Sequence, residues 1–283
     1  MLKRILTAVI GIAFGIAVVA MHNTIVYPIV VAIVAALSVH ELLTACECGI
    51  KKFPVHYLMC EAFALLLPIL NWFDGIHLIW KIFAGAVIVF FLFAGFVADN
   101  KKLPFSKLAM MVSVTLLVTL SVSCLNSLVK LSPTHGVCYV VMSLMAAWVP
   151  DAGAYFVGSA IGKHKMCPNI SPHKTIEGAV GGVVVSVIVF AIYAAIYRLV
   201  MAQLFDAHFS VNYLYLSIGV IAAAVISIIG DLSASLIKRE YGIKDFGNIF
   251  PGHGGMVDRF DSVYFVLPFV MLSMTAFGDK VFF

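Results

Sequence analysis

The chain has 283 residues, of which 63% are hydrophobic and only 11% are charged, and its mean hydropathy is +1.07. A spanning helix needs roughly 20 mostly apolar residues, so this composition indicates an integral membrane protein and excludes a large soluble domain. The net charge of +4 does not indicate a nucleic-acid partner, because basic residues in a membrane protein first of all set its topology. The chemistry must therefore reside in loops and at helix ends.

Apolar segments predict an all-α, polytopic fold with about nine transmembrane helices. In chain order they cover residues 5–21, 24–44, 57–70, 76–98, 108–129, 136–149, 178–205, 213–237 and 263–277. The third and sixth are short for a span. Lys3 and Arg4 before the first segment resemble the start of a signal peptide, but no clear small-residue cleavage site follows. We therefore expect an uncleaved first helix.

The distribution of basic residues predicts a cytoplasmic N-terminus. The cytoplasmic segments would then be the N-terminus and residues 45–56, 99–107, 151–177 and 238–262. They contain every Lys and Arg except Lys81, Lys130, Arg198 and Lys280. The positive-inside rule predicts such a bias, which a shift of the frame by one helix would destroy. Since no long hydrophilic extension precedes the first segment, we expect a bacterial cytoplasmic membrane protein with its active site on the cytoplasmic side.

The polar loops concentrate in the second half of an otherwise single membrane-embedded domain. We divide it into N-terminal helices, residues 1–149, and C-terminal helices with the candidate catalytic loops, residues 150–283. The six cysteines show no repeated metal-binding spacing. Cys46 and Cys48 flank one glutamate, which is a weak metal signal, and small buried thiols are the expected interpretation.

Asp231 is an intramembrane carboxylate in the eighth apolar segment. It lies in "VISIIGDLSASLIKRE", so deep in apolar sequence that its ionised form must be paired or metal-bound. Ser235 and Lys238 follow at i+4 and i+7 and share its helix face. That face would lead from the membrane toward the cytoplasmic loop.

This loop carries two further carboxylates, Asp258 and Asp261. They are three residues apart, so on a helical turn they point the same way. With Asp231 they suit a hard divalent cation, because Mg²⁺ typically takes one or two carboxylates and completes its shell with water and phosphate oxygens. The alternative is that Asp258 and Asp261 cap the last helix and pair with Arg259.

Glycines surround His253 in the same loop. Gly252, Gly254 and Gly255 would let the backbone turn tightly and approach a ligand closely. His253 could bind a phosphate or brace the loop.

Two more charged residues lie near predicted helix ends. Lys174, in "SPHKTIEG", precedes an apolar helix whose N-terminus would attract anions, so it could bind a phosphate. An ordinary interfacial lysine is the alternative. Asp151 follows Pro150 at the end of the sixth segment, where a helix-breaking role and a site role are equally consistent.

The run "SLIKREYGIKDFGNIFPGHGGMVDRFD" resembles the signature of the phosphatidate cytidylyltransferases, also called CDP-diacylglycerol synthases. The upstream segments "DAGAYFVG" and "SPHKTIEG" are also similar to that family, with Ala152 where Ser or Thr is expected. The resemblance covers roughly residues 150–262, and the N-terminal half is similar only as a set of spans.

The resemblance implies a Mg²⁺-dependent nucleotidyltransferase of phospholipid biosynthesis. CTP and membrane phosphatidic acid would give CDP-diacylglycerol and pyrophosphate, by in-line attack of the lipid phosphate on the α-phosphorus of CTP. It implies Asp231, Asp258 and Asp261 as catalytic metal ligands and Lys238 as a further catalytic residue, and a second metal or a monovalent cation remains an option. The implied substrate-binding residues are Ser171, Lys174, Ser235, Arg239, Lys244, His253 and Arg259.

Other functions compete with this interpretation. A polyprenol or phytol kinase of related fold, or an archaeal-type synthase acting on ether-lipid phosphates, would share the use of CTP. A CDP-alcohol phosphotransferase is disfavoured because its Asp-Gly-x-x-Ala-Arg pattern is absent. A transporter could bind an ion at Asp231 but would not need a basic loop. Gly178 and Gly182 could pack a homodimer, and packing within one subunit is equally consistent.

Overall fold

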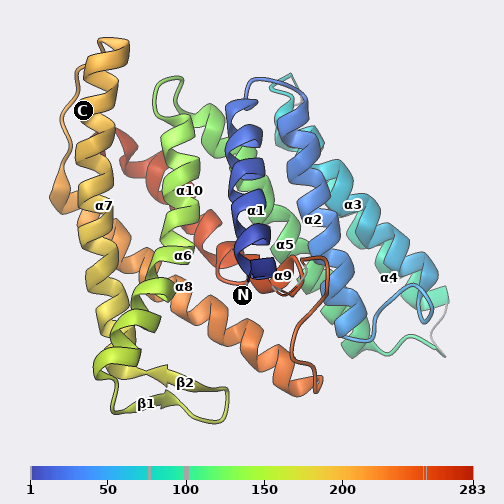
Figure 1. Cartoon of the computed structure of the whole chain (residues 1–283). Coiled ribbons are helices and arrows are strands. Elements are labelled where there is room, and N and C mark those ends of the chain that lie inside the picture. Colours follow the sequence, from blue (N-terminus) through green and yellow to red (C-terminus); the bar gives the residue numbers. More distant parts are fainter. Residues whose placement is uncertain (1, 76–77, 99–101, 251, 253, 283) are drawn as a thin grey trace. The chain divides into compact units, whose positions relative to one another are not determined.

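A computed structural model describes residues 2–75, 78–98, 102–250, 252 and 254–282, with side chains omitted for residues 2–8 and 78. Within this part of the chain the structure is helical apart from one hairpin (Figure 1). The elements are α1 (Leu2–Ala20), α2 (Val26–Ala45), α3 (Pro54–Trp72), α4 (Leu78–Ala98), α5 (Phe105–Leu131), α6 (Gly136–Ile161), β1 (Lys165–Cys167), β2 (Ser171–Thr175), α7 (Ile176–Phe205), α8 (Tyr213–Glu240), α9 (Val257–Phe260) and α10 (Val263–Val281).

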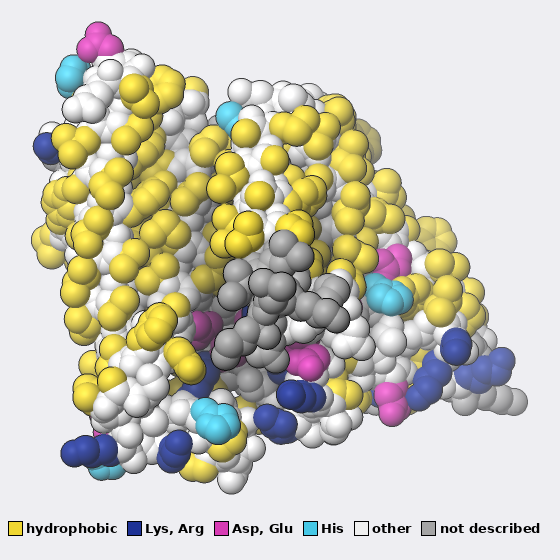
Figure 2. All heavy atoms as spheres, in the orientation of Figure 1, with side chains coloured by type: hydrophobic (Ala, Val, Ile, Leu, Met, Phe, Trp, Pro, Cys, Tyr) yellow, Lys and Arg dark blue, Asp and Glu magenta, His cyan; other side chains and the backbone are white. Residues whose placement is uncertain are grey.

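The helices confirm an all-α, polytopic membrane protein. Among the described residues, eight helices are long and apolar enough to cross a membrane, namely α2 to α8 and α10. The described apolar stretch of α1, Val9–Ala20, is shorter. Figure 2 shows hydrophobic side chains along the flanks of the helices, with most visible Lys and Arg toward helix ends and loops. A ninth span and a cytoplasmic N-terminus stay predictions.

Two segments predicted to be short spans form full-length helices. Helix α3 has 19 residues and α6 has 26. The prediction that the sixth span ends at residue 149 is wrong, because α6 continues through Pro150 to Ile161. A proline inside a helix removes one backbone hydrogen bond, a loss that packed membrane helices tolerate. Asp151 therefore lies inside a helix, and a helix-breaking role for this position is excluded.

The chain folds into two compact units. The first unit comprises Met1–Lys130 and Glu240–Phe260, and the second comprises Leu131–Arg239 and Asp261–Phe283. The segment with the family signature is thus divided between the two units. Its residues up to Arg239 and its last residue, Asp261, belong to the second unit. The loop between them belongs to the first unit.

In the first unit, α2 packs against α3, α3 against α4, and the short α9 against α2. Helix α5 is joined to this group by polar bonds as well as apolar packing. Asn126 donates a hydrogen bond of 2.7 Å from Nδ2 to the Pro68 carbonyl, and Tyr27 donates one of 3.3 Å to the Leu125 carbonyl. Such bonds between buried groups hold apolar helices together where lipid provides little driving force.

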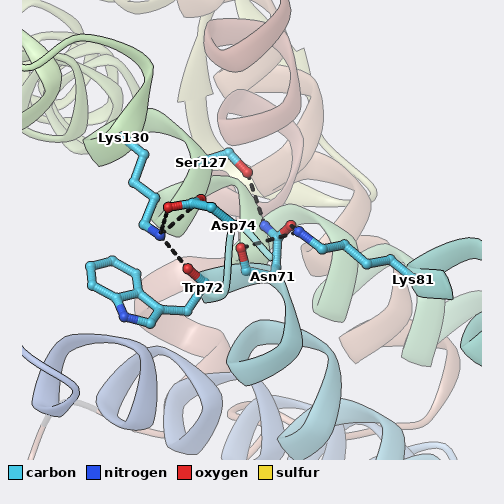
Figure 3. A network of polar contacts seen from close by, with 6 residues as sticks. All are labelled: Asn71, Trp72, Asp74, Lys81, Ser127 and Lys130. Carbon is cyan, nitrogen blue, oxygen red and sulfur yellow. Dashed lines mark hydrogen bonds and ion pairs between the residues drawn. The ribbon is translucent and has the colours of Figure 1, made fainter. Parts of the chain in front are cut away.

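A polar network joins the ends of α3 and α5 to the start of α4 (Figure 3). Lys130 pairs with Asp74 at 2.9 Å and lies 4.3 Å from the centroid of the Trp72 ring. Lys81 donates a hydrogen bond of 3.2 Å to Asn71 Oδ1. Lys81 and Lys130 are two of the four basic residues outside the predicted cytoplasmic segments, and each has local partners here.

In the second unit, α6 packs along α7, and α10 packs against α6. Gly182 allows this close approach, because a Cβ atom there would overlap the carbonyl oxygen of Pro150. Gly178 likewise lies against the carbonyl of Ala154. The Gly178 and Gly182 pair therefore packs two helices of the same chain, and the sequence argument for a homodimer loses its basis.

Candidate active site

A cluster of three charged side chains lies within the second unit. Lys174, at the end of β2, forms an ion pair through Nζ with Oδ2 of Asp231 in α8. The same ammonium lies 3.7 Å from Oδ1 of Asp151 in α6. The side chains are 24%, 19% and 34% exposed, respectively. Asp231 therefore has the partner that its position in an apolar helix requires.

The β1–β2 hairpin places Lys174 in this cluster. It connects the end of α6 to the start of α7 (Figure 1). Thr175 caps α7 by accepting a hydrogen bond of 3.1 Å from the Gly178 N–H. Glu177 accepts the backbone N–H groups of Lys163 and His164, each at 3.1 Å. These bonds hold the two ends of the hairpin next to each other. They thereby position Lys174, near the end of β2, in the cluster.

Asp261 belongs to the same neighbourhood in the second unit. Gly230, directly before Asp231, packs so closely on Ser262 that an added Cβ would lie 3.1 Å from the Ser262 Cα. Ser262 directly follows Asp261, whose Oδ1 accepts the Ser262 N–H at 2.7 Å. Asp261 is therefore adjacent in sequence to a residue that packs directly on the helix of Asp231.

The remaining predicted site residues of the second unit surround the end of α8 and the hairpin. Ser235 and Lys238 are half-buried on α8, and Arg239 is exposed. Arg239 donates a hydrogen bond of 3.3 Å from Nε to the Ile170 carbonyl. Ser171 follows as the first residue of β2. The structure therefore brings the hairpin and the end of α8 together, as a phosphate site built from both would require.

In the first unit, Asp258 holds the glycine-rich loop. Its Oδ2 accepts the N–H of Phe246 at 2.8 Å and the N–H of Gly255 at 2.9 Å. Gly254 has φ +84°, in the left-handed region that glycine favours, as the sequence predicts for a tight turn. Lys244 is exposed. This loop-holding role is structural, but it differs from the alternative offered by the sequence, in which Asp258 caps the last helix and pairs with Arg259.

Arg259 is exposed within α9, and His253 lies outside the described residues. Among the described residues, no three His, Cys, Asp or Glu side chains gather closely enough to hold one metal ion. Of the predicted metal ligands, Asp231 and Asp261 belong to the second unit, and Asp258 belongs to the first. A metal held by all three stays a prediction.

Cys46 and Cys48 are fully buried, as the sequence predicts. Burial raises the pKa of the Cys46 thiol to about 11, as is typical of buried structural cysteines. Lys107 donates a hydrogen bond of 2.8 Å to the Cys46 carbonyl and lies 5.2 Å from the centroid of the Tyr241 ring. This region is structural, and it anchors the first residues after α8 to the first unit.

Sequence reasoning missed Glu41. This residue lies in α2, is 4% exposed, and accepts the N–H of Val257 at 2.9 Å through Oε2. The signal was present, because Glu41 is a lone carboxylate in the apolar run "VVAIVAALSVHELLTA". The criterion that singled out Asp231, the cost of an intramembrane charge, applies equally to Glu41.

Comparisons with known proteins agree with the signature. A model described as the Cytidylyltransferase family matches residues 2–277. The phosphatidate cytidylyltransferase of Bacillus subtilis (strain 168) is 40% identical over 146 residues, which are 51% of this chain and 50% of the relative. That of Staphylococcus haemolyticus (strain JCSC1435) is 39% identical over 135 residues, 48% of each chain. The chain spans about half the length of the curated relatives it matches.

Proposed function

The chain belongs to the cytidylyltransferase family, and from this premise we propose that it transfers a cytidylyl group from CTP to phosphatidic acid, releasing pyrophosphate and forming CDP-diacylglycerol. The relatives named phosphatidate cytidylyltransferase support this choice of substrates. The observation that carries the proposal is the cluster of Asp231, Lys174 and Asp151. Ionisable residues in spanning helices are costly and commonly mark functional sites, which supports placing the reaction at this cluster.

The reaction must bring two anions together. The phosphate monoester of the lipid has a second pKa near about 6, so it is largely ionised and needs no strong general base. The cationic side chains at the end of α8, Lys238 and Arg239, and the ammonium of Lys174 would offset the charge of the phosphates. Their fixed positions would hold the lipid oxygen in line with the bond to pyrophosphate.

We propose Mg²⁺ as the cofactor. Hard carboxylate oxygens are the ligands that Mg²⁺ prefers, and Asp231 and Asp261, both in the second unit, are the candidate ligands there. Bound there, Mg²⁺ would polarise a phosphate oxygen and stabilise the negative charge that develops on it. Asp258 is a further candidate ligand from the sequence. A second metal or a monovalent cation is a variant of this proposal.

The proposed setting is the cytoplasmic side of a bacterial membrane. The helices support an integral membrane protein, and the relatives are bacterial. The bias of Lys and Arg toward one set of loops supports a cytoplasmic site, where soluble CTP meets a lipid in the membrane.

One experiment tests the function. The purified protein in detergent is incubated with Mg²⁺ and CTP labelled in the α-phosphate, with and without phosphatidic acid. We expect label in CDP-diacylglycerol only when phosphatidic acid is present. A second incubation uses CTP labelled in the γ-phosphate, with a polyprenol or phytol in place of phosphatidic acid. Label that enters lipid only in this second incubation would identify a lipid kinase instead. Label in neither case would contradict both activities.

A further inference from the structure

Glu41 is the one carboxylate of α2, and it contacts the glycine-rich loop from a distant part of the sequence. Its Oε2 accepts the Val257 N–H at 2.9 Å. Its Oε1 is buried and has no hydrogen-bond partner among the described residues. All these atoms belong to the first unit. Two carboxyl groups, those of Asp258 and Glu41, therefore hold the loop by accepting its backbone N–H groups.

The loop sequence is adapted to this carboxylate. A Cβ atom added at Gly247 would overlap Glu41 Oε1, and one added at Gly255 would overlap both carboxylate oxygens. These two glycines are therefore required for contact with Glu41 and not for a positive φ, which both lack. Glu41, a residue outside the signature segment, thus explains why these two positions of the segment are glycine.

An ionised Glu41 side chain would be costly at this position. An ionisable group in a spanning helix is expensive, and a neutral acceptor could receive a single N–H at lower cost. A carboxylate makes shorter and stronger bonds to backbone N–H groups than a neutral oxygen does. The cost is understandable if the loop must be rigid. Lys244, just before the loop, and Arg259, shortly after it, are both exposed to solvent.

We infer that Glu41 is a positioning residue, which fixes residues 246–250 and 254–257 in the conformation that presents the flanking side chains of Lys244 and Arg259 to phosphates. The inference depends on the proposed function in one respect only, the identity of the phosphates that are bound. The contact of Glu41 with the loop can be tested without any substrate.

The first test measures amide hydrogen exchange of residues 246–257 in the substrate-free protein. Glu41→Ala removes the acceptor of Val257, and we expect exchange there to become faster by about tenfold or more. Glu41→Gln keeps one acceptor oxygen and should give an intermediate rate. Glu47→Gln is the matched control, because Glu47 is 59% exposed and pairs with Lys52. Unchanged exchange in Glu41→Ala would overturn the inference.

The second test uses the steric fit. Gly255→Ala forces a methyl group onto the Glu41 carboxylate, so it should accelerate exchange in the loop, while Gly255→Ala combined with Glu41→Ala should be no worse than Glu41→Ala alone. Additive effects would contradict the contact. Gly219→Ala is the control, since an added Cβ there meets nothing within 4 Å. If Glu41→Ala does not fold, Gly247→Ala with Glu41 in place carries the same expectation of faster exchange.

The third test separates positioning from folding. With CTP and phosphatidic acid, we expect kcat/KM for CTP to fall by about tenfold or more in Glu41→Ala, with partial rescue in Glu41→Gln and with an unchanged unfolding temperature in detergent. Full activity in Glu41→Ala would overturn the positioning role. If the wild-type protein does not turn over CTP, the proposed function fails, while the exchange measurements still decide whether Glu41 holds the loop.

Discussion

Two carboxylates within apolar helices, one in each unit, obtain their polar partners in different ways. Asp231 in the second unit pairs with the ammonium of Lys174. Glu41 in the first unit instead accepts a backbone N–H from Val257. An ion pair can open when a competing charge arrives, whereas a backbone contact fixes the chain. From this difference we expect Asp231 to act in the proposed chemistry and Glu41 to set the shape of a loop.

Removing the charge of Asp231 gives the largest expected effect. Asp231→Asn keeps the shape but removes one of the two carboxylates that pair with Lys174, and it removes a proposed Mg²⁺ ligand. Electrostatic contributions of this kind are worth about 3 to 4 kcal/mol, or roughly 10²- to 10³-fold in rate. We expect a loss of that size in turnover of labelled CTP by well-folded protein.

The matched control for Asp231→Asn is Asp74→Asn. Asp74 also pairs with a lysine, Lys130, but its side chain is 84% exposed, and exposed ion pairs contribute little. We expect its activity and unfolding temperature to stay close to those of the wild-type protein. Equal losses in the two variants would remove the distinction between a functional and a structural ion pair.

Lys174→Met should have the next largest effect. It removes the ammonium that pairs with Asp231 and approaches Asp151, and it leaves two carboxylates near each other without that cation. We expect turnover to fall by about 10- to 100-fold, and the double variant with Asp231→Asn to be far less than multiplicatively worse. Multiplicative losses would show that the two residues act independently, against the ion pair as a functional unit.

A smaller effect should distinguish the two loop aspartates. Asp261→Asn weakens the proposed metal site, so the Mg²⁺ concentration for half-maximal activity should rise by about tenfold. Asp258→Asn replaces the acceptor of two backbone N–H groups, so it should lower activity with little change in Mg²⁺ dependence. An equal shift in Mg²⁺ dependence would instead make Asp258 a metal ligand, as the sequence predicts.

The sequence predicted the parts of this comparison that depend on composition and local pattern. Apolar length identified the spanning helices, and the cost of a charge in an apolar run singled out Asp231. The end of the sixth span was misplaced, because a local reading of Pro150 cannot include the packing of α6 on α7. Lys174 was assigned to a phosphate and not to Asp231, since pairing between a hairpin and a distant helix leaves no spacing signal. Glu41 was missed for the same reason.

The last prediction concerns membrane topology. The two cysteine substitutions that test it should have the smallest effect on activity. Asn248 lies exposed in the loop that Glu41 contacts, and His208 lies exposed between α7 and α8. In a background with Cys124→Ser and Cys167→Ser, which removes the two cysteines that are not buried, Asn248→Cys and His208→Cys should both leave turnover within about twofold. A membrane-impermeant thiol reagent should label position 248 only from the cytoplasmic side and position 208 only from the opposite side. Reversed labelling would contradict the cytoplasmic site, and with it the proposal that the loop held by Glu41 meets soluble CTP.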